Sequence, residues 1–241
     1  MKIVCAIQAR MRSARLPGKV LEELGERPIL SWVVRAAREA ALGGPIVVAT
    51  GSGDEDDPIV ALAERERVAV VRGHPTDVLS RFLQVVDETR ADCVVRLTAD
   101  SPLIPPEVIR AAVATFGADV CDYVGTFLPR TLPLGLGVEV VSAKTLRDIA
   151  DVATGHHRSH VTSYIYSNST SFRLIGLTFS PAAPHLRLTV DEPDDLALLR
   201  EVVARIGDVA PRYDQVLQVF EREPQLGEIN AHVRQRSVDA G

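Results

Sequence analysis

Short runs of apolar residues alternate along the chain with stretches in which apolar residues recur every three or four positions. A short apolar run bounded by turn residues is typical of a buried strand, and the longer period is typical of an amphipathic helix. In the segment 29–41, for example, Ile29, Val33 and Ala37 share one helical face. The first half of the chain therefore predicts strands at 2–7, 45–50, 68–71 and 92–97, and helices at 29–41, 58–67, 77–89 and 106–116.

This alternation of strand and helix predicts an α/β fold with a mostly parallel sheet and helices on both faces. After residue 118 the rhythm changes, and a loop rich in proline and glycine spans 125–137. Because no repeat or linker divides the sequence, we expect one domain over 1–232 and a flexible tail over 233–241. The second half predicts strands at 118–123, 138–141, 171–178 and 185–190, and helices at 144–152, 157–168, 193–206 and 213–221.

Charge and cysteine content narrow the classes of protein to consider. The 241 residues carry a net charge of −5, which argues against nucleic acid or a membrane surface as the partner of the whole chain. Cys5, Cys93 and Cys121 lack metal-ligand spacing, and their odd number argues against a disulfide framework. The N-terminus lacks the pattern of a signal peptide, and no apolar stretch reaches membrane-spanning length. We therefore expect a reduced, cytoplasmic protein.

The segment directly after the first predicted strand, residues 8–19, is rich in cations. Arg10, Arg12, Arg15 and Lys19 follow the carboxyl end of that strand, which is where ligands bind in open α/β sheets. Arginine makes paired contacts to phosphate and lysine supplies a point charge, so this loop fits a triphosphate. The alternative is a solvated basic loop. The spacing matches neither a Walker loop nor a glycine-rich dinucleotide motif.

Two aspartates, Asp100 and Asp191, each directly follow a predicted strand. Mg²⁺ prefers one or two carboxylates together with phosphate oxygens, so both are candidate ligands. The alternative for each is to cap the next helix. Prolines between Asp100 and its helix argue against a cap there, whereas spacing alone leaves the role of Asp191 open. Asp194 and Asp195 fall in a first helical turn, where negative charge is favourable, and we interpret them as structural.

These segments resemble those of the CMP-sugar-acid synthetase superfamily, above all its spore-coat polysaccharide cytidylyltransferase-like branch. That branch reads Gln-Ala-Arg-Met-Gly-Ser-Thr-Arg-Leu-Pro-Gly-Lys near its N-terminus, close to residues 8–19. Its Leu-Thr-Val-Asp-x-Pro-x-Asp-Leu is matched at 188–196. Further matches at 96–104, 129–131, 160–162 and 228–230 follow in the same order, so the resemblance covers nearly the whole chain.

The resemblance implies a single-domain, Rossmann-like three-layer sandwich of the nucleotide-diphospho-sugar transferase type. It also implies a magnesium-dependent, homodimeric enzyme that moves CMP from CTP to a small acidic acceptor and releases pyrophosphate. The implied metal ligands are Asp100 and Asp191, and the implied catalytic residues are Arg10, Arg15, Lys19 and Asp100. The implied nucleotide-binding residues are Gln8, Ala9, Arg10, Met11, Arg12, Ser13, Arg15, Lys19, Asp77, Arg81, Thr98 and Ala99.

Some of these assignments have structural alternatives. Asp77 and Arg81 equally fit an ion pair one helical turn apart at the start of a helix. His160 equally fits a helix-surface or core histidine. The residues expected around the acceptor are Arg12, Arg96, Arg130, Glu139, His160, Tyr164 and Arg187.

The sequence departs from the branch mainly where the acceptor is expected. Leu134 and Gly137 stand where the branch has aspartates, and Arg12 stands where it has glycine. Fewer carboxylates and one more cation slightly favour a phosphonate acceptor, such as phosphonoformate, over a sugar acid. The alternatives are a nucleotidyltransferase of the same fold that uses a different nucleotide or a phosphorylated sugar, and a non-catalytic nucleotide-binding homologue.

Overall fold

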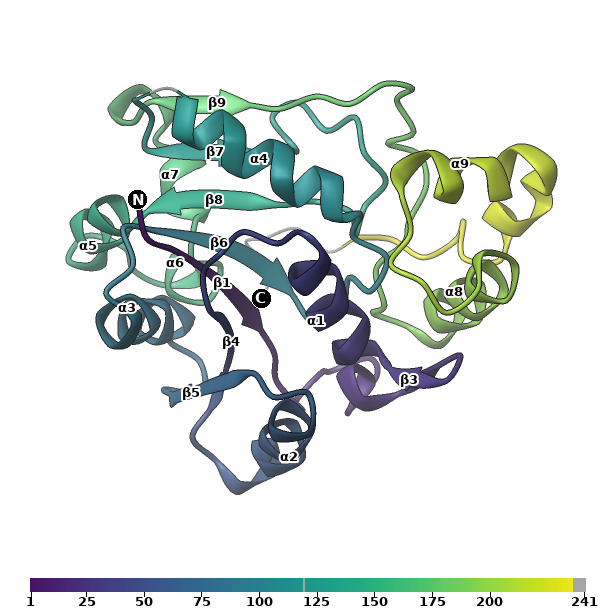
Figure 1. Cartoon of the computed structure of the whole chain (residues 1–241), viewed down its shortest axis with the longest axis horizontal. Helices are drawn as coiled ribbons and strands as arrows, with labels where there is room; N and C mark the ends of the chain where they lie inside the picture. Colours follow the sequence, from purple (N-terminus) through teal and green to yellow (C-terminus); the bar gives the residue numbers. More distant parts are fainter. Residues whose placement is uncertain (119, 236–241) are drawn as a thin grey trace.

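The computed structural model describes residues 1–118 and 120–235, and its centre is a seven-stranded sheet with the order β5-β4-β1-β6-β8-β7-β9 (Figure 1). Strand β8 runs antiparallel to its neighbours β6 and β7, and the remaining pairs are parallel. The prediction of a mostly parallel sheet is confirmed. The strands are β1 (Ile3–Gln8), β4 (Ile46–Gly51), β5 (Ala69–Gly73), β6 (Cys93–Thr98), β7 (Tyr123–Gly125), β8 (Glu139–Ser142) and β9 (Leu174–Gly176).

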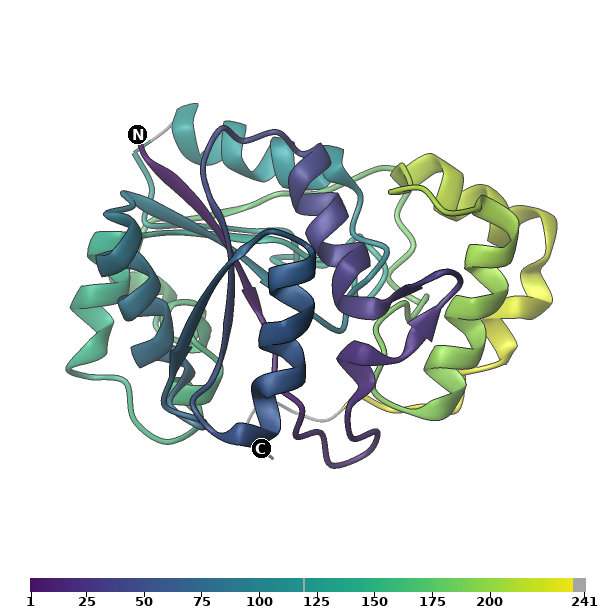
Figure 2. The same cartoon turned by 60° about the horizontal axis from the view of Figure 1, so that its bottom comes forward.

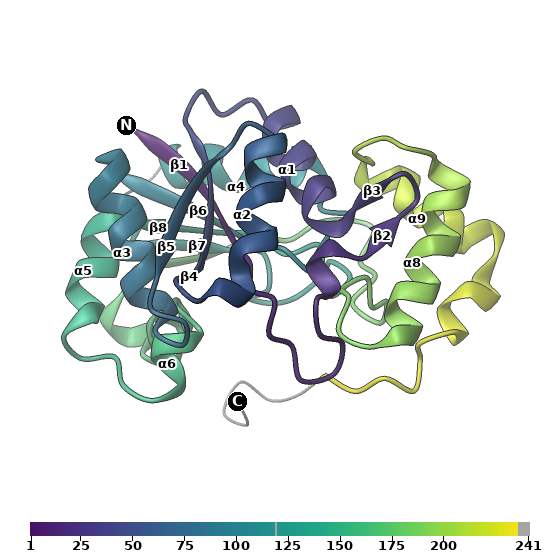
Figure 3. The same cartoon turned by 90° about the horizontal axis from the view of Figure 1, so that it is seen from below.

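Helices cover both faces of the sheet, so the fold has three layers. Because side chains alternate along a strand, Cys5 and Ile7 of β1 belong to one apolar core, while Val4 and Ala6 belong to another on the opposite face. The view from below separates the two helical layers (Figure 3). The first core contains α1 (Ile29–Glu39), α2 (Asp57–Arg65) and α4 (Pro106–Ala118), and the second contains α3 (Val78–Thr89), α5 (Ala143–Ala150) and α7 (Ser163–Ser167).

The order of the strands creates a switch point beside β1. The chain proceeds from β1 outward through β4 to β5, and then returns to the other side of β1 to form β6. In open α/β sheets, connections that diverge at such a point leave a crevice at the carboxyl ends of the two strands. Parallel register pairs Gln8 with Thr98, so both strands end at the same level and the loops that follow lie side by side.

A small lobe extends from one end of the sheet (Figure 2). It contains α8 (Pro193–Ile206), α9 (Tyr213–Arg222) and the two-stranded sheet of β2 (Glu23–Leu24) and β3 (Arg27–Pro28), which packs against α8. The remaining short helices are α6 (His156–Ser159) and the 3₁₀ turns η1 (Lys19–Leu21), η2 (Asp54–Asp56), η3 (Ser169–Ser171) and η4 (Pro224–Glu228). The pattern of the sequence did not predict the β2–β3 hairpin.

Three predicted elements of the second half are wrong. The segment 185–190 forms no strand of the sheet; it crosses the strand ends, and Val190 N–H donates to the Asp100 carbonyl at 2.8 Å. The strand expected at 118–123 begins only at Tyr123, because α4 continues to Ala118. The helix expected at 157–168 is split into α6 and α7. Short apolar runs carry too little periodicity to fix such boundaries.

Other expectations from the sequence hold. Cys5 and Cys93 are buried in the apolar cores, and helices α8 and α3 begin within one residue of their predicted starts. Among the described residues, no helix is both long enough and apolar enough to cross a bilayer. The expected tail over 233–241 falls largely outside the described residues.

Asp195 fixes the start of α8 and is fully buried. Its Oδ2 accepts the backbone N–H groups of Asp191 and Glu192 at 2.9 and 3.1 Å, and completes a capping box with Glu192. Its Oδ1 accepts from Nε of Arg187 and from Nδ2 of Asn230, both at 2.8 Å. This carboxylate therefore ties the segment around Asp191 to the C-terminal part of the chain, as a structural residue.

Replacing Asp195 should destabilise the protein strongly. Asp195→Ala leaves the guanidinium of Arg187 buried without its main partner, and we expect the free energy of unfolding to fall by about 3–5 kcal/mol. Asp194→Ala is the matched control, because that neighbouring side chain is 52% exposed and its expected effect is within about 0.5 kcal/mol. Urea denaturation of both variants measures the difference. Equal losses would contradict the assignment.

Candidate functional site

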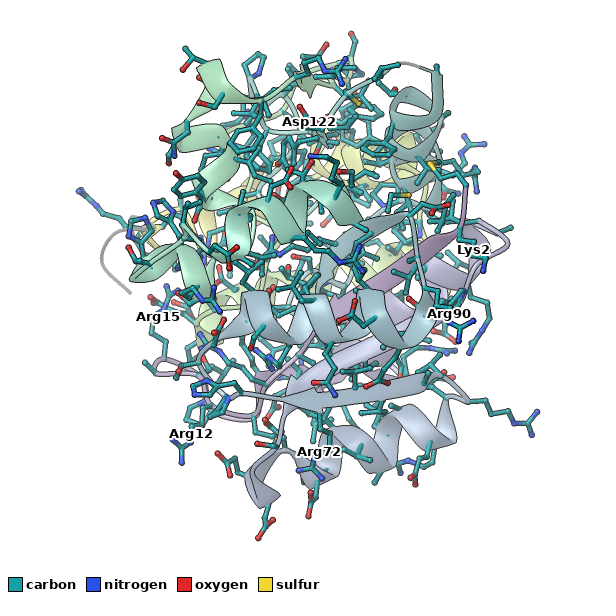
Figure 4. All side chains as sticks on the ribbon, turned by 90° about the vertical axis from the view of Figure 1, so that its left-hand side faces the viewer. Lys2, Arg12, Arg15, Arg72, Arg90 and Asp122 are labelled. Carbon is teal, nitrogen blue, oxygen red and sulfur yellow. The ribbon has the colours of Figure 1, made fainter. Side chains whose placement is uncertain are left out.

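A pocket of about 490 Å³ opens at the carboxyl ends of β1 and β6, within the roughly 300–1,000 Å³ range of small-molecule sites. Figure 4 places Arg12 and Arg15 at this edge of the molecule, and Lys2 and Arg90 at the opposite edge, before β1 and β6 begin. The switch point of the sheet and the pocket therefore coincide. The predicted site residues that line the pocket are Gln8, Arg10, Arg12, Ser13, Arg15, Lys19, Arg96, Thr98, Ala99, Asp100, Glu139, His160 and Asp191.

The loop after β1 is closed by its own backbone. Gly18 N–H donates to the Met11 carbonyl at 2.9 Å, and Gly18 has a φ of 74°, which glycine adopts without strain. Asp56, which is buried, accepts Met11 N–H at 2.7 Å and Gly51 N–H at 2.9 Å, so it anchors the loop to the end of β4. The sequence analysis missed Asp56, because nothing in a run of acidic residues distinguishes the one that turns inward.

Lys19 lies between the two candidate metal ligands. Its Nζ donates to Asp100 Oδ2 at 2.7 Å, to Asp191 Oδ1 at 2.8 Å and to the Val190 carbonyl at 2.6 Å. Burial alone would lower the pKa of Lys19, but the two aspartates together raise it above its ordinary value. The ammonium is therefore charged at neutral pH, and it holds the two carboxylates on either side of one point.

The second oxygen of Asp191 faces two arginines. Arg15 Nη2 lies 3.0 Å from Asp191 Oδ2, and Arg187 Nη2 donates to the same oxygen at 2.8 Å. Burial would raise the pKa of Asp191, but Lys19, Arg15 and Arg187 together lower it below its ordinary value. Asp191 is thus ionised, and it does not cap α8, whose N-cap is Glu192.

The arrangement fits a hard divalent cation that also binds phosphate. Asp100 and Asp191 present one oxygen each to the common point that the Lys19 ammonium occupies. Among the residues that the structure describes, no group of three or more His, Cys, Asp or Glu side chains could hold a metal by itself. Two carboxylates completed by water and phosphate oxygens are the usual magnesium environment, so the residues present fit Mg²⁺.

The opposite wall of the pocket is built on a buried carboxylate, Glu139. Tyr123 donates its hydroxyl to Glu139 Oε1 at 2.8 Å, and Thr162 and Arg96 also donate to this carboxylate. Burial, followed by the negative charge of Glu139, raises the pKa of Tyr123 well above its ordinary value. Arg96 Nη2 in turn donates to Gln8 Oε1 at 3.0 Å. Glu139 therefore serves mainly to orient Arg96, whose side chain lines the pocket.

His160 lines the same wall. Burial, followed by the positive charge of Arg96, lowers its pKa below the ordinary value for histidine, so the ring is neutral at pH 7. Leu134, Gly135 and Gly137 form the part of the wall where the resemblance leads one to expect carboxylates. Gly135 has a φ of 101°, and a side chain there would meet the Leu188 backbone at 2.5 Å, so the close approach of these two segments requires glycine.

Several residues expected in the site have other partners. Arg12 is 81% exposed and pairs with Glu55 at 3.1 Å, although it also borders the pocket. Asp77 lies at the start of α3, which it caps through Ser80 N–H at 3.0 Å, but it pairs with Arg158, so the alternative of an ion pair with Arg81 is wrong. Ala9, Met11, Arg130 and Tyr164 also do not line the pocket. Ala9 directly follows β1, Met11 lies in the loop after it, Arg130 is exposed, and Tyr164 packs on His157 and Phe172.

Arg187 is expected to face the acceptor, but all its donors are directed elsewhere. It binds Asp191 and Asp195, and its Nη1 donates to Gln235 Oε1 at 2.7 Å. Gln235 itself borders the pocket, so the C-terminal segment after η4 closes one side of it, beside the loop after β1 (Figure 3). Sequence patterns gave no sign of Gln235, since contacts between chain ends leave no periodic signal.

Arg81 is buried in a different way. It is fully inaccessible, and none of its three guanidinium nitrogens has a hydrogen-bond partner among the described residues. Burial lowers its pKa to about 10; the charges of Asp56 and Asp77 partly offset this effect, and the charge of Arg10 adds to it. Buried polar groups are nearly always paired, so a guanidinium without a partner requires an explanation other than stability.

The sequence matches the family model of the cytidylyltransferases over residues 4–220. An uncharacterized protein of Methanocaldococcus jannaschii, MJ1063, is 34% identical over 240 residues, which cover 98% of each chain. The spore coat polysaccharide biosynthesis protein SpsF of Bacillus subtilis is 32% identical over 214 residues, 86% of this chain and 88% of SpsF. The 3-deoxy-manno-octulosonate cytidylyltransferase of Chelativorans sp. (strain BNC1) is 30% identical and covers 94% of this chain and 97% of its own.

Solved structures share the fold. A cytidylyltransferase from Leptospira borgpetersenii superposes with a TM-score of 0.92 at 24% identity, over 98% of this chain and all of its own. CMP:2-keto-3-deoxy-manno-octonic acid synthetase complexed with CTP gives a TM-score of 0.68 at 15% identity, over 86% of this chain and 100% of its own. The manganese complex of Rv0371C from Mycobacterium tuberculosis gives a TM-score of 0.61 at 18% identity, over 83% of this chain and 99% of its own. The three-layer fold expected from the sequence is confirmed.

Two buried arginines should respond oppositely to the same substitution. Arg81→Met removes a desolvated charge without breaking a hydrogen bond, and we expect it to raise the free energy of unfolding by about 1–4 kcal/mol. Arg187→Met is the matched control: it leaves the buried Asp195 without its cation, removes one of the three cations around Asp191, and should lower that free energy by about 3–5 kcal/mol. Urea denaturation decides. Destabilisation by both variants would show that Arg81 has a structural partner after all.

Proposed function

We propose that this chain, which belongs to the cytidylyltransferase family, transfers CMP from CTP to a small acidic acceptor and releases pyrophosphate. The family membership makes it a nucleotidyltransferase enzyme. The observation that carries the finer proposal is the convergence of Asp100 and Asp191 on one cation position beneath the cationic loop. The CTP complex of one fold neighbour and the manganese complex of another support the nucleotide and a divalent metal as ligands.

The nucleotide side is assigned to the loop after β1 and the ends of its neighbouring strands. Arg10, Arg15 and Lys19 are the cations of this half that border the pocket, and they are placed to meet phosphate oxygens. The unpaired guanidinium of Arg81 lies beneath the same half, with Arg10 and Asp77 among the charges that act on it. Because Arg81 is fully inaccessible and does not line the pocket, it would act on a bound nucleotide through its charge and not by direct contact. The segment around Ala9 would then help to bind the base through its backbone.

The acceptor is placed between Arg96, His160 and the wall formed by Leu134 to Gly137. Its oxygen attacks the α-phosphorus of CTP in line with the departing pyrophosphate. When bound by Asp100 and Asp191, Mg²⁺ supplies Lewis-acid stabilisation of charge on the phosphate oxygens. Arg10 and Arg15 stabilise the charge on the departing pyrophosphate. A phosphonate oxygen is already ionised at neutral pH and attacks without a strong general base, which agrees with a neutral His160.

The two aspartates test the proposal directly. Asp100→Asn and Asp191→Asn replace a carboxylate with a neutral amide, a weak ligand for Mg²⁺. We expect release of pyrophosphate from CTP with an acidic acceptor to fall by about a hundredfold or more in each variant, with the fold intact by circular dichroism. Asp194→Asn, at an exposed neighbouring carboxylate, should keep normal turnover. Near-normal turnover of Asp100→Asn would contradict the metal assignment.

The class of acceptor follows from the wall of the pocket. Leu134 and Gly137 offer no charge to repel a multiply charged anion, whereas a carboxylate there would cost about 4 kcal/mol at ~4 Å with an effective dielectric near 20. Arg12 attracts an anionic acceptor less than its charge suggests, because its side chain is exposed and paired with Glu55. We therefore favour a small phosphonate, such as phosphonoformate, and keep a sugar acid as the second candidate.

A competition experiment separates the two classes of acceptor. The enzyme receives CTP and Mg²⁺ with equal amounts of phosphonoformate, ketodeoxyoctonate and neuraminate, and the CMP conjugates are quantified. We expect the phosphonate conjugate to dominate. In Gly137→Asp, the added Cβ atom would lie 3.5 Å from Thr126 Oγ1, which is an ordinary contact. This variant should reduce the phosphonate conjugate more than the other two. Preference of the unaltered enzyme for either sugar acid would contradict the phosphonate while leaving the transfer of CMP in place.

A further inference from the structure

The ammonium of Lys19 stands at the point where a cation shared by Asp100 and Asp191 would stand. Its three hydrogen bonds, at 2.6, 2.7 and 2.8 Å, use all three of its donors. The side chain is only 10% exposed, so water does not compete for these contacts. The remaining oxygen of Asp191 is held by Arg15 and Arg187 and is turned away from that point.

A metal ion and this ammonium exclude one another. A magnesium ion bonds carboxylate oxygens at about 2.0–2.1 Å, and the gap between the two aspartates already contains a nitrogen within hydrogen-bond distance of both. Two cations of the same sign in this half-buried gap would also repel strongly. The aspartates can therefore share a metal only after the ammonium has left.

The pocket offers Lys19 one suitable destination. Its backbone is fixed at the start of η1, but its four-carbon stem can swing. Arg10, Ser13 and Arg15 border the space beside it. Besides Asp100 and Asp191, Glu139 is the one carboxylate among the described residues that line the pocket, and Arg96, Tyr123 and Thr162 already donate to it. An ammonium that moves there is left without a counter-ion unless an anion is present, and the phosphates of a nucleotide provide that anion.

We propose that Lys19 is an internal cation that closes the metal site of the free protein and yields it when a nucleotide polyphosphate arrives. This inference rests on the proposed function, because it takes Asp100 and Asp191 as the metal ligands. In the free protein, Lys19 lowers the affinity for divalent metal. In the presence of CTP, it exchanges the carboxylates for phosphate, so metal and nucleotide bind with positive coupling.

Mn²⁺ is the probe, because it shares the preference of Mg²⁺ for carboxylate oxygens and free Mn²⁺ is visible by electron paramagnetic resonance. Binding of Mn²⁺ is measured without nucleotide for the unaltered protein and for Lys19→Met, which keeps the length of the stem and removes the charge. We expect Lys19→Met to bind one Mn²⁺ at least about tenfold more tightly, since the repelling charge is gone. The added substitution Asp100→Asn should abolish that gain.

Arg15→Met is the matched control. It removes one positive charge from the same Asp191, but Arg15 lies at Oδ2 and not between the two aspartates. Its gain in affinity for Mn²⁺ should be clearly smaller than that of Lys19→Met, because Arg15 lies farther from the shared cation position and is also paired with Glu192. Equal gains for Lys19→Met and Arg15→Met would overturn the proposal, because general electrostatics would then suffice. No gain for Lys19→Met, or a gain that survives Asp100→Asn, would also overturn it.

The unaltered protein provides a second, independent measurement. Without nucleotide it should bind Mn²⁺ weakly. Saturating CTP should raise the affinity of the protein for Mn²⁺ at least about tenfold, after the Mn²⁺ that free CTP chelates has been subtracted. Tight binding of Mn²⁺ by the free protein would overturn the proposal even if Lys19→Met fails to fold. Failure of the proposed function has a different signature: the protein would bind neither CTP nor CTP with Mn²⁺, whatever residue stands at position 19.

Discussion

A single buried ammonium holds the centre of this pocket together. Lys19 joins the loop after β1, the turn after β6 and the segment that leads into α8, which come from distant parts of the chain. It can do so because parallel register ends β1 and β6 at one level, and because Gly18 turns the loop back toward the sheet. The position of each carboxylate in the pocket therefore depends on the strand register beneath it, and the chemistry inherits the rigidity of the sheet.

The charges around Asp191 stabilise one another only as a set. Lys19, Arg15 and Arg187 are all largely buried, and each has at least one carboxylate within 3.1 Å. Such buried charges are costly unless they are fully paired, so removing any member exposes the desolvation cost of its partners. Arg81 lacks this protection. A protein selected for stability alone would pair or replace it.

The sequence predicted the parts of the site that lie on regular elements. The strands that end at Gln8 and Thr98 have clear apolar patterns, and the place of the cationic loop at the carboxyl end of the first strand followed from them. The sequence also distinguished Asp195, interpreted as a structural residue, from Asp191, a candidate metal ligand. Contacts between remote segments could not be predicted: Arg187 meets Gln235, Asp56 anchors Met11, and Thr162 reaches Glu139 only through the break between α6 and α7. These contacts depend on packing in three dimensions, which leaves no period in the sequence.

The two halves of the pocket meet at Arg96. Its guanidinium is held by Gln8 from the nucleotide side and by Glu139 from the acceptor side, while Glu139 is itself fixed by Tyr123 and Thr162. Arg96 therefore has little freedom to move, and under the proposed function the anionic group of an acceptor would have to come to it. Leu134 and Gly137 lie on a loop outside this network, whereas Gly135 between them is fixed by its close approach to the Leu188 backbone. Under the proposed function, a fixed arginine beside exchangeable side chains at 134 and 137 would allow different acceptors to be selected while the geometry of transfer stays the same.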